Sequence, residues 1–140
     1  MTDDLSHDWS RRHAPSLDDF EVMAQAAFAA LPDGFRALCE GVVIRIEDFP
    51  DDETLRDLDC ESPFDLLGLF RGVGLAQASA SHESGQFPNM VWLYRRPILE
   101  YWAEHEETLG HLITHVLVHE IGHHFGLSDE DMEAIEENAA

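Results

Sequence analysis

The chain has 140 residues, enough for a single hydrophobic core but not for two. Its 29 acidic residues against 8 basic ones give a net charge of −21, and every basic residue is an arginine. A field of that sign repels nucleic-acid phosphates and anionic membranes, so we expect neither as a partner, whereas a basic peptide or protein would be attracted.

Two features of the sequence indicate the compartment. No apolar run approaches the roughly 20 residues that span a bilayer, and residues 1–15 contain acids in place of the apolar segment of a signal peptide. We therefore expect a cytoplasmic protein. Its two cysteines, Cys39 and Cys60, lack the spacing of a cysteine zinc site, and we expect two unpaired buried thiols.

The first predicted element is a helix that follows an N-terminal arm. Residues 1–15 have mixed charge and no periodic apolar pattern, which indicates a flexible arm ahead of a single domain over residues 16–140. Ser16 and Asp19 have the spacing of a capping box, and apolar residues then recur at helical intervals as far as Leu31. These features predict an amphipathic helix at the start of the domain.

The next part of the chain alternates apolar segments with turn-rich ones. Residues 41–49 are rich in β-branched side chains and predict a strand. Residues 50–62 predict an acidic surface loop with at most one helical turn. Ser62 and the proline after it predict a short helix that extends through residues 64–70. A second short strand is expected within residues 71–79.

A second clear strand and a helix follow. Residues 81–89 predict a flexible loop, and residues 89–96 predict a strand that Pro97 closes. Residues 98–107 predict a helical segment. The chain therefore returns to helical structure before its most apolar region.

The C-terminal part predicts a long helix and a short one. The long helix spans residues 108–126, and Gly126 is placed to end it in a left-handed turn. Ser128 and Asp131 form another capping box for the last helix. Together the elements predict a small α+β domain, in which a short two- to four-stranded sheet packs on a long helix near the C-terminus.

The long helix contains the sequence HEIGH, which is a metal-binding pattern. His119 and His123 are four residues apart and lie on one face of a helix, so both imidazoles can reach one zinc ion at roughly 2.0–2.1 Å. Glu120 lies about 100° around the helix, near the metal but not necessarily bound to it. A carboxylate in that position can accept the proton of a metal-bound water.

A catalytic zinc needs a third protein ligand and an open fourth position. The motif continues as HExxHxxGxxD, and Gly126 permits a chain reversal after which Asp129 can return toward the histidines. Asp129 is the best candidate for the third ligand, with Asp131 and Glu133 as alternatives. The competing interpretation is that Asp129 is only a first-turn acid favoured by the helix dipole.

Other histidines repeat along the same helix. His111 and His115 continue the spacing of four, so any adjacent pair could chelate a metal, but neither is followed by the glutamate and the glycine–aspartate pair. We expect His115 to be a supporting or core histidine and His111 to be solvated. His124 adjoins the site and could contact a developing oxyanion, although it points about 100° away from His123. Apolar residues that would bury this helix are Ile113, Val116, Leu117, Val118 and Ile121.

These residues resemble those of the zincin metallopeptidases, and more closely those of a small bacterial family of minimal zincins. The matching stretches are LLGLFRGVGL (66–75), PNMVWLYRRPI (88–98) and HVLVHEIGHHFGLSDEDM (115–132). The resemblance spans most of residues 16–137. It implies a compact zincin-like domain with a strand beside the cleft, a zinc ion held by His119, His123 and Asp129, and Glu120 as the general base.

The hypothesis is a zinc-dependent metallopeptidase in which Glu120 assists a zinc-bound water to hydrolyse peptide bonds. Candidate residues for the oxyanion, none assigned by spacing, are Tyr94, Tyr101, Arg95 and Arg96. If NMVWLY (89–94) is an edge strand, an extended peptide could pair with it. One alternative is a non-catalytic, zinc-stabilised acidic module that binds a basic protein. Another is a metal-free domain whose histidines are satisfied by hydrogen bonds in the core.

Overall fold

A three-stranded sheet lies at the centre of the protein. The computed structural model describes residues 8–72 and 89–139, and in this part the strand order is β1-β3-β2. Strand β1 (Val43–Glu47) runs parallel to β3 (Met90–Tyr94), and β2 (Gly68–Arg71) runs antiparallel to it. Because β3 is hydrogen-bonded on both sides, it is not an edge strand, and the condition on which a peptide could pair with residues 89–94 is not met.

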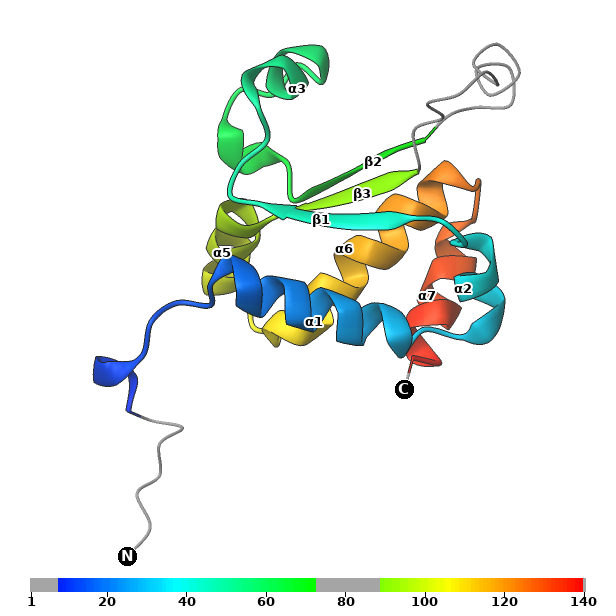
Figure 1. The fold of residues 1–140 in the computed structure, drawn as a ribbon, viewed down its shortest axis with the longest axis horizontal. Coiled ribbons are helices and arrows are strands. Elements are labelled where there is room, and N and C mark those ends of the chain that lie inside the picture. Colours follow the sequence, from blue (N-terminus) through cyan, green and yellow to red (C-terminus); the bar gives the residue numbers. More distant parts are fainter. Residues whose placement is uncertain (1–7, 73–88, 140) are drawn as a thin grey trace, which may run out of the picture.

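Two helices cover one face of this sheet (Figure 1). Helix α1 (Leu17–Ala29) packs against β1, and helix α6 (Leu109–His124) packs against β2, β3 and α1. Helix α7 (Asp129–Glu137) follows α6 and packs on it. The remaining elements are η2 (Trp9–Arg11), α2 (Asp33–Leu38), α3 (Asp52–Asp57), η3 (Pro63–Asp65) and α5 (Arg95–Glu104). This arrangement confirms the predicted small α+β domain with a sheet on a long helix near the C-terminus.

The hydrophobic core lies between the sheet and the two helices. Val91 and Leu93 point from β3 into this core, and Phe20 of α1 meets them there, all three with no exposed surface. The apolar residues predicted to bury α6 are indeed buried. Burial of each such side chain contributes about 1.5–3 kcal/mol, so packing rather than intrinsic helix propensity holds α6 in place.

Both predicted capping boxes are present. The Ser16 hydroxyl accepts a hydrogen bond from the Asp19 N–H (3.1 Å), and the Asp19 carboxylate accepts one from the Ser16 N–H (2.9 Å). These hydrogen bonds lower the pKa of Asp19 because they favour its charged form. Ser128 and Asp131 make the same reciprocal pair at the start of α7. The two helix starts were therefore predicted correctly.

The region around β2 differs from the predicted helix. Only Pro63–Asp65 forms a helical turn, and residues 68–71 form a strand, because their backbone groups pair with β3. The end of β3 also differs, since α5 begins at Arg95 and places Pro97 in its first turn. A proline is tolerated there because the first-turn N–H groups have no partner within the helix. The predicted loop at 50–62 contains α3.

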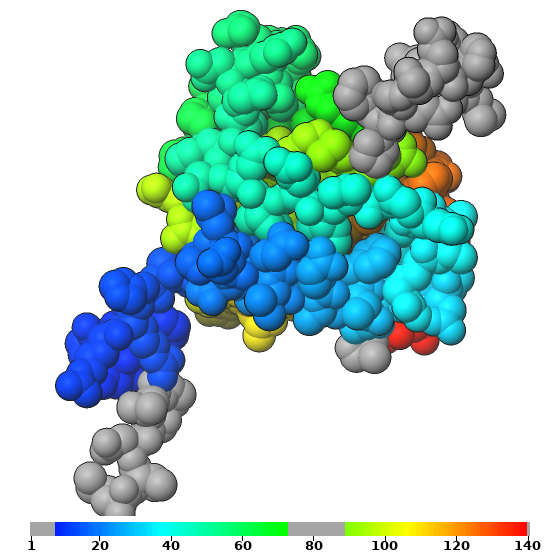
Figure 2. All heavy atoms as spheres, in the orientation of Figure 1, coloured from blue at the N-terminus to red at the C-terminus, as the bar shows by residue number. Residues whose placement is uncertain are grey.

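Other predictions lie wholly or partly outside the described residues. These include most of the strand expected within residues 71–79 and nearly all of the loop at 81–89. The part of the arm that is described, residues 8–15, extends away from the domain body in Figure 2. Arg95 holds its end, because the Arg95 Nε donates to the Pro15 carbonyl (2.6 Å). The flexible arm and the domain boundary at residue 16 stay predictions.

Two further findings concern the expected compartment and the cysteines. Among the described helices, none is long and apolar enough to cross a membrane. Cys39 is buried and Cys60 is partly buried, and both are free thiols. The expected burial is therefore found for Cys39, whereas Cys60 is more exposed than expected.

Candidate metal centre

A tight chain reversal joins the two helices that carry the predicted site. Gly126 has a φ of +75°, which favours glycine, and its N–H donates to the His123 carbonyl (3.1 Å). The Leu127 N–H donates to the Gly122 carbonyl (2.9 Å). This pair of bonds is a Schellman motif, which satisfies the last carbonyls of α6 and turns the chain back. The left-handed turn predicted at Gly126 is confirmed.

Close packing then fixes α7 against α6. A Cβ atom at Gly122 would lie 2.5 Å from the Sδ of Met132, so only glycine allows Met132 to approach the helix this closely. Met132 has no exposed surface. Asp129, Glu133 and Glu136 share one face of α7 by their spacing of four and three residues. The position of α7 therefore decides which of these acids meets the histidines of α6.

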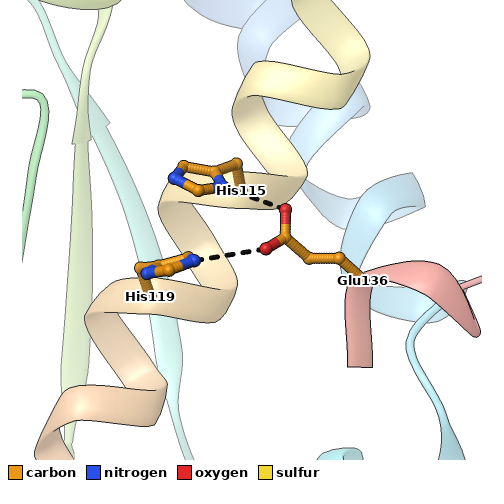
Figure 3. A group of neighbouring side chains, drawn as sticks. All are labelled: His115, His119 and Glu136. Atoms are coloured by element: carbon orange, nitrogen blue, oxygen red, sulfur yellow. Dashed lines mark hydrogen bonds and ion pairs between the residues drawn. The ribbon is translucent and has the colours of Figure 1, made fainter. Parts of the chain in front are cut away.

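Glu136 is the acid of α7 that contacts the histidines (Figure 3). Its Oε1 lies 3.0 Å from the Nδ1 of His115, and its Oε2 lies 3.2 Å from the Nε2 of His119. The two imidazole rings lie 4.0 Å apart between centroids. One ligand atom from each residue can be chosen so that all three lie within 4.8 Å of one another. Two imidazoles and a carboxylate are a donor set that suits zinc.

The predicted ligands occupy neighbouring positions. The rings of His119 and His123 are 5.7 Å apart between centroids and nearly perpendicular, and His123 is exposed. Asp129 is the exposed first residue of α7, and no hydrogen bond or ion pair joins it to a histidine in the part of the chain that the structure describes. Their joint role as zinc ligands stays a prediction.

The two alternative third ligands lie elsewhere on α7. The Asp131 carboxylate accepts the Ser128 N–H (3.1 Å) and so caps its own helix. Glu133 lines a hollow of about 320 Å³ beside His111, His115 and Glu136. Sequence reasoning missed Glu136 altogether. Its spacing of seven from Asp129 was the available signal, but the contact with His115 depends on how α7 packs on α6.

The neighbouring histidines also have defined surroundings. The side chain of His115 is 47% exposed, which excludes the core position that was one of its two expected roles. His111 is exposed, as expected. The His124 ring packs on Phe70 with 4.1 Å between ring centroids and lies beside Gly72. His124 is therefore directed toward the β2 strand.

Glu120 lies on the side of α6 that faces β2. A Cβ atom at Gly68 would be 3.3 Å from the Glu120 Cγ, 2.6 Å from Val116 and 3.0 Å from the Trp92 carbonyl oxygen. Burial raises the pKa of the Glu120 carboxyl, and nearby His123 partly opposes this effect. The side chain that we predicted as the general base thus lies partly buried where α6 faces β2.

This close approach gives a stability prediction. Gly68→Ala should lower the free energy of unfolding by about 1–3 kcal/mol, because the new methyl group forces β2 away from α6. Gly110→Ala is the matched control, since its Cβ would meet nothing within 4 Å and alanine favours the helix. We expect that control to raise stability by about 0.4–1 kcal/mol. Urea unfolding measures the free energy of unfolding of both variants. Equal changes in Gly68→Ala and Gly110→Ala would show that the close approach at Gly68 is unimportant.

Three of the four candidate oxyanion residues are engaged away from the histidines. Tyr94 lies next to Leu93 in β3 and so points to the opposite face of the sheet, where it lines a hollow of about 200 Å³. Arg95 pairs with an aspartate of the loop after β1, and Arg96 lies over an aromatic ring there. Tyr101 stacks on a neighbouring histidine but also lines a hollow with His115. Tyr101 is the one of the four that lies beside a histidine of α6.

Comparison of the sequence with protein families gives a match. A family model described as "zincin-like metallopeptidase" matches residues 39–139, which is most of the chain. This range includes the three strands, α6 and α7. No curated protein matches the chain.

Proposed function

Because the chain belongs to the zincin-like metallopeptidase family, we propose that it is a zinc-dependent peptidase with Glu120 as its general base. In this proposal His119, His123 and Asp129 hold the zinc ion. The observation that carries it is the position of Glu120, partly buried next to the HExxH histidines and within contact distance of Gly68 in β2. That position would put a proton acceptor beside a strand to which a peptide can bind.

The chain's own residues would supply binding and proton transfer. Zinc, when bound, supplies a Lewis acid that polarises the peptide carbonyl and acidifies water. The spacing of His119 and His123 on a buried, well-packed helix would orient both imidazoles without a large loss of side-chain entropy. The Glu120 carboxylate would accept a proton from the attacking water and return it to the nitrogen of the leaving amine.

Strand β2 is the strand that we propose for substrate binding. The Tyr94 N–H donates to the Leu67 carbonyl (2.9 Å), so Leu67 and then every second residue point their backbone groups toward β3. The backbone groups of Gly68 and Phe70 therefore point to the other side. An extended peptide could pair with them by β-augmentation, and Gly68 would bring it next to Glu120.

The charge of the chain favours a basic peptide as substrate. A net charge of −21 attracts cationic ligands over a range of about one Debye length, roughly 10 Å at 0.1 M salt. We therefore expect kcat/KM for an arginine-rich peptide to fall as sodium chloride is raised from 50 to 500 mM. An acidic peptide of equal length is the control and should show no such fall. Equal salt dependence of the two peptides would contradict this preference.

The direct test is cleavage of a defined peptide library. We expect the zinc-loaded protein to cleave peptides, to lose this activity after chelation, and to recover it when zinc is added back. Mass spectrometry of the products identifies the cleaved bonds. Binding of basic peptides without any zinc-dependent cleavage would instead support the non-catalytic module.

The compartment we propose is the cytoplasm, where free thiols such as Cys39 and Cys60 persist.

A further inference from the structure

A cluster of three side chains lies where α7 packs on α6: His115, His119 and Glu136. Of these three residues, only His119 belongs to the HExxH motif. The Glu136 side chain is only 14% exposed, and its carboxylate bridges one nitrogen of each imidazole. A carboxylate with so little exposed surface needs hydrogen-bond donors or a cation beside it. Neutral imidazoles provide only one N–H each. A bound cation would satisfy this carboxylate more fully.

The geometry also fits a metal ion. The two histidines are one helical turn apart on α6, and Glu136 approaches them from α7 (Figure 3). The contact of Gly122 with Met132 and the Schellman motif hold the two helices together, so the three ligands are arranged before any ion binds. Preorganised ligands lose little conformational entropy on binding. Two imidazoles and one glutamate, with an open fourth position, are a ligand set used for zinc in proteins.

We propose that His115, His119 and Glu136 form a second metal-binding position for a divalent transition metal such as zinc. We call this cluster the α6–α7 triad. A neutral imidazole has one nitrogen lone pair available, so His119 binds one ion at a time. A metal ion in the α6–α7 triad and a metal ion in the HExxH site therefore cannot be bound at the same time. This second statement rests on the proposed function, whereas the triad itself does not.

An ion in the α6–α7 triad is held away from the general base. Glu120 faces Gly68 of β2, whereas Glu136 approaches His119 from α7 on another side of the helix. An ion in the triad would therefore lie on the α7 side of His119, away from the β2 side where Glu120 lies.

Titration of the metal-free protein with Co²⁺ tests the triad, because tetrahedral Co²⁺ absorbs visible light with a spectrum that depends on its ligands. His123→Ala removes the HExxH pair, and Glu136→Gln removes the charged ligand of the triad. We expect each variant to bind one Co²⁺ per chain with a different spectrum. The double variant should lose binding, with a rise in Kd of at least about a hundredfold. Glu130→Gln, an exposed acid of α7, is the matched control and should bind as the wild type does.

The outcomes separate this proposal from the proposed function. If His123→Ala loses Co²⁺ while Glu136→Gln keeps it with an unchanged spectrum, the triad does not bind metal and the HExxH site stands. If Glu136→Gln loses Co²⁺ and His123→Ala keeps it, the triad stands and the HExxH site fails. Loss in both single variants would overturn the idea of two separate positions. Circular dichroism of each metal-free variant identifies a loss of binding that comes from unfolding.

Discussion

Glu120→Gln is expected to lower kcat/KM for peptide cleavage by about 10²–10⁴-fold, while the protein still binds zinc. Glutamine has nearly the same size and shape but cannot accept a proton at neutral pH. The Glu120 Cγ lies close to Gly68 of β2, and this packing remains in the variant. The change therefore removes the proposed base and little else.

Glu120→Gln should leave the free energy of unfolding unchanged or raise it, whereas a disruptive mutation would lower it. Burial raises the pKa of Glu120, which means that its charged form is disfavoured in the folded state. A neutral glutamine removes that cost, so the variant should unfold at an equal or higher urea concentration. Cleavage assays, zinc content and urea unfolding should be measured together, with exposed Glu104→Gln as the control. Activity equal to that of the wild type would exclude Glu120 as the base.

His119→Ala should have the largest effect on metal binding, because His119 belongs to both metal positions that we propose. Loss of one imidazole leaves a single histidine and one carboxylate at either position, which is fewer protein ligands than zinc sites require. We expect the Kd for zinc to rise by at least about a hundredfold. Single replacements outside His119 leave one of the two positions intact and should have smaller effects.

Competition with a chromogenic chelator measures this change, and His105→Ala provides the control. His105 is exposed and stacks on Tyr101, so its loss changes the histidine content without touching α6. The fold of His119→Ala should persist, since His119 is only partly buried and lies outside the hydrophobic core. Wild-type zinc affinity in this variant would contradict both metal positions at once.

Local patterns in the sequence were sufficient for the starts of α1 and α7 and for the end of α6. Ser16 with Asp19 and Ser128 with Asp131 predicted two helix starts correctly, because a capping box is completed by residues three apart. Gly126 predicted the end of α6 from a local preference as well, because the positive φ that ends the helix strongly favours glycine. The spacing of His119 and His123 places them on one helix face without reference to the rest of the fold.

Only the tertiary structure decided which elements meet. Residues 68–71 form a strand because β3 is available to pair with them, although their local sequence favoured a helix. The same pairing makes β3 the middle strand. Glu136 contacts His115 and His119 because a turn at Gly126 and the missing side chain at Gly122 let α7 lie against α6. Such contacts depend on the relative placement of two helices, which periodicity within either helix does not specify.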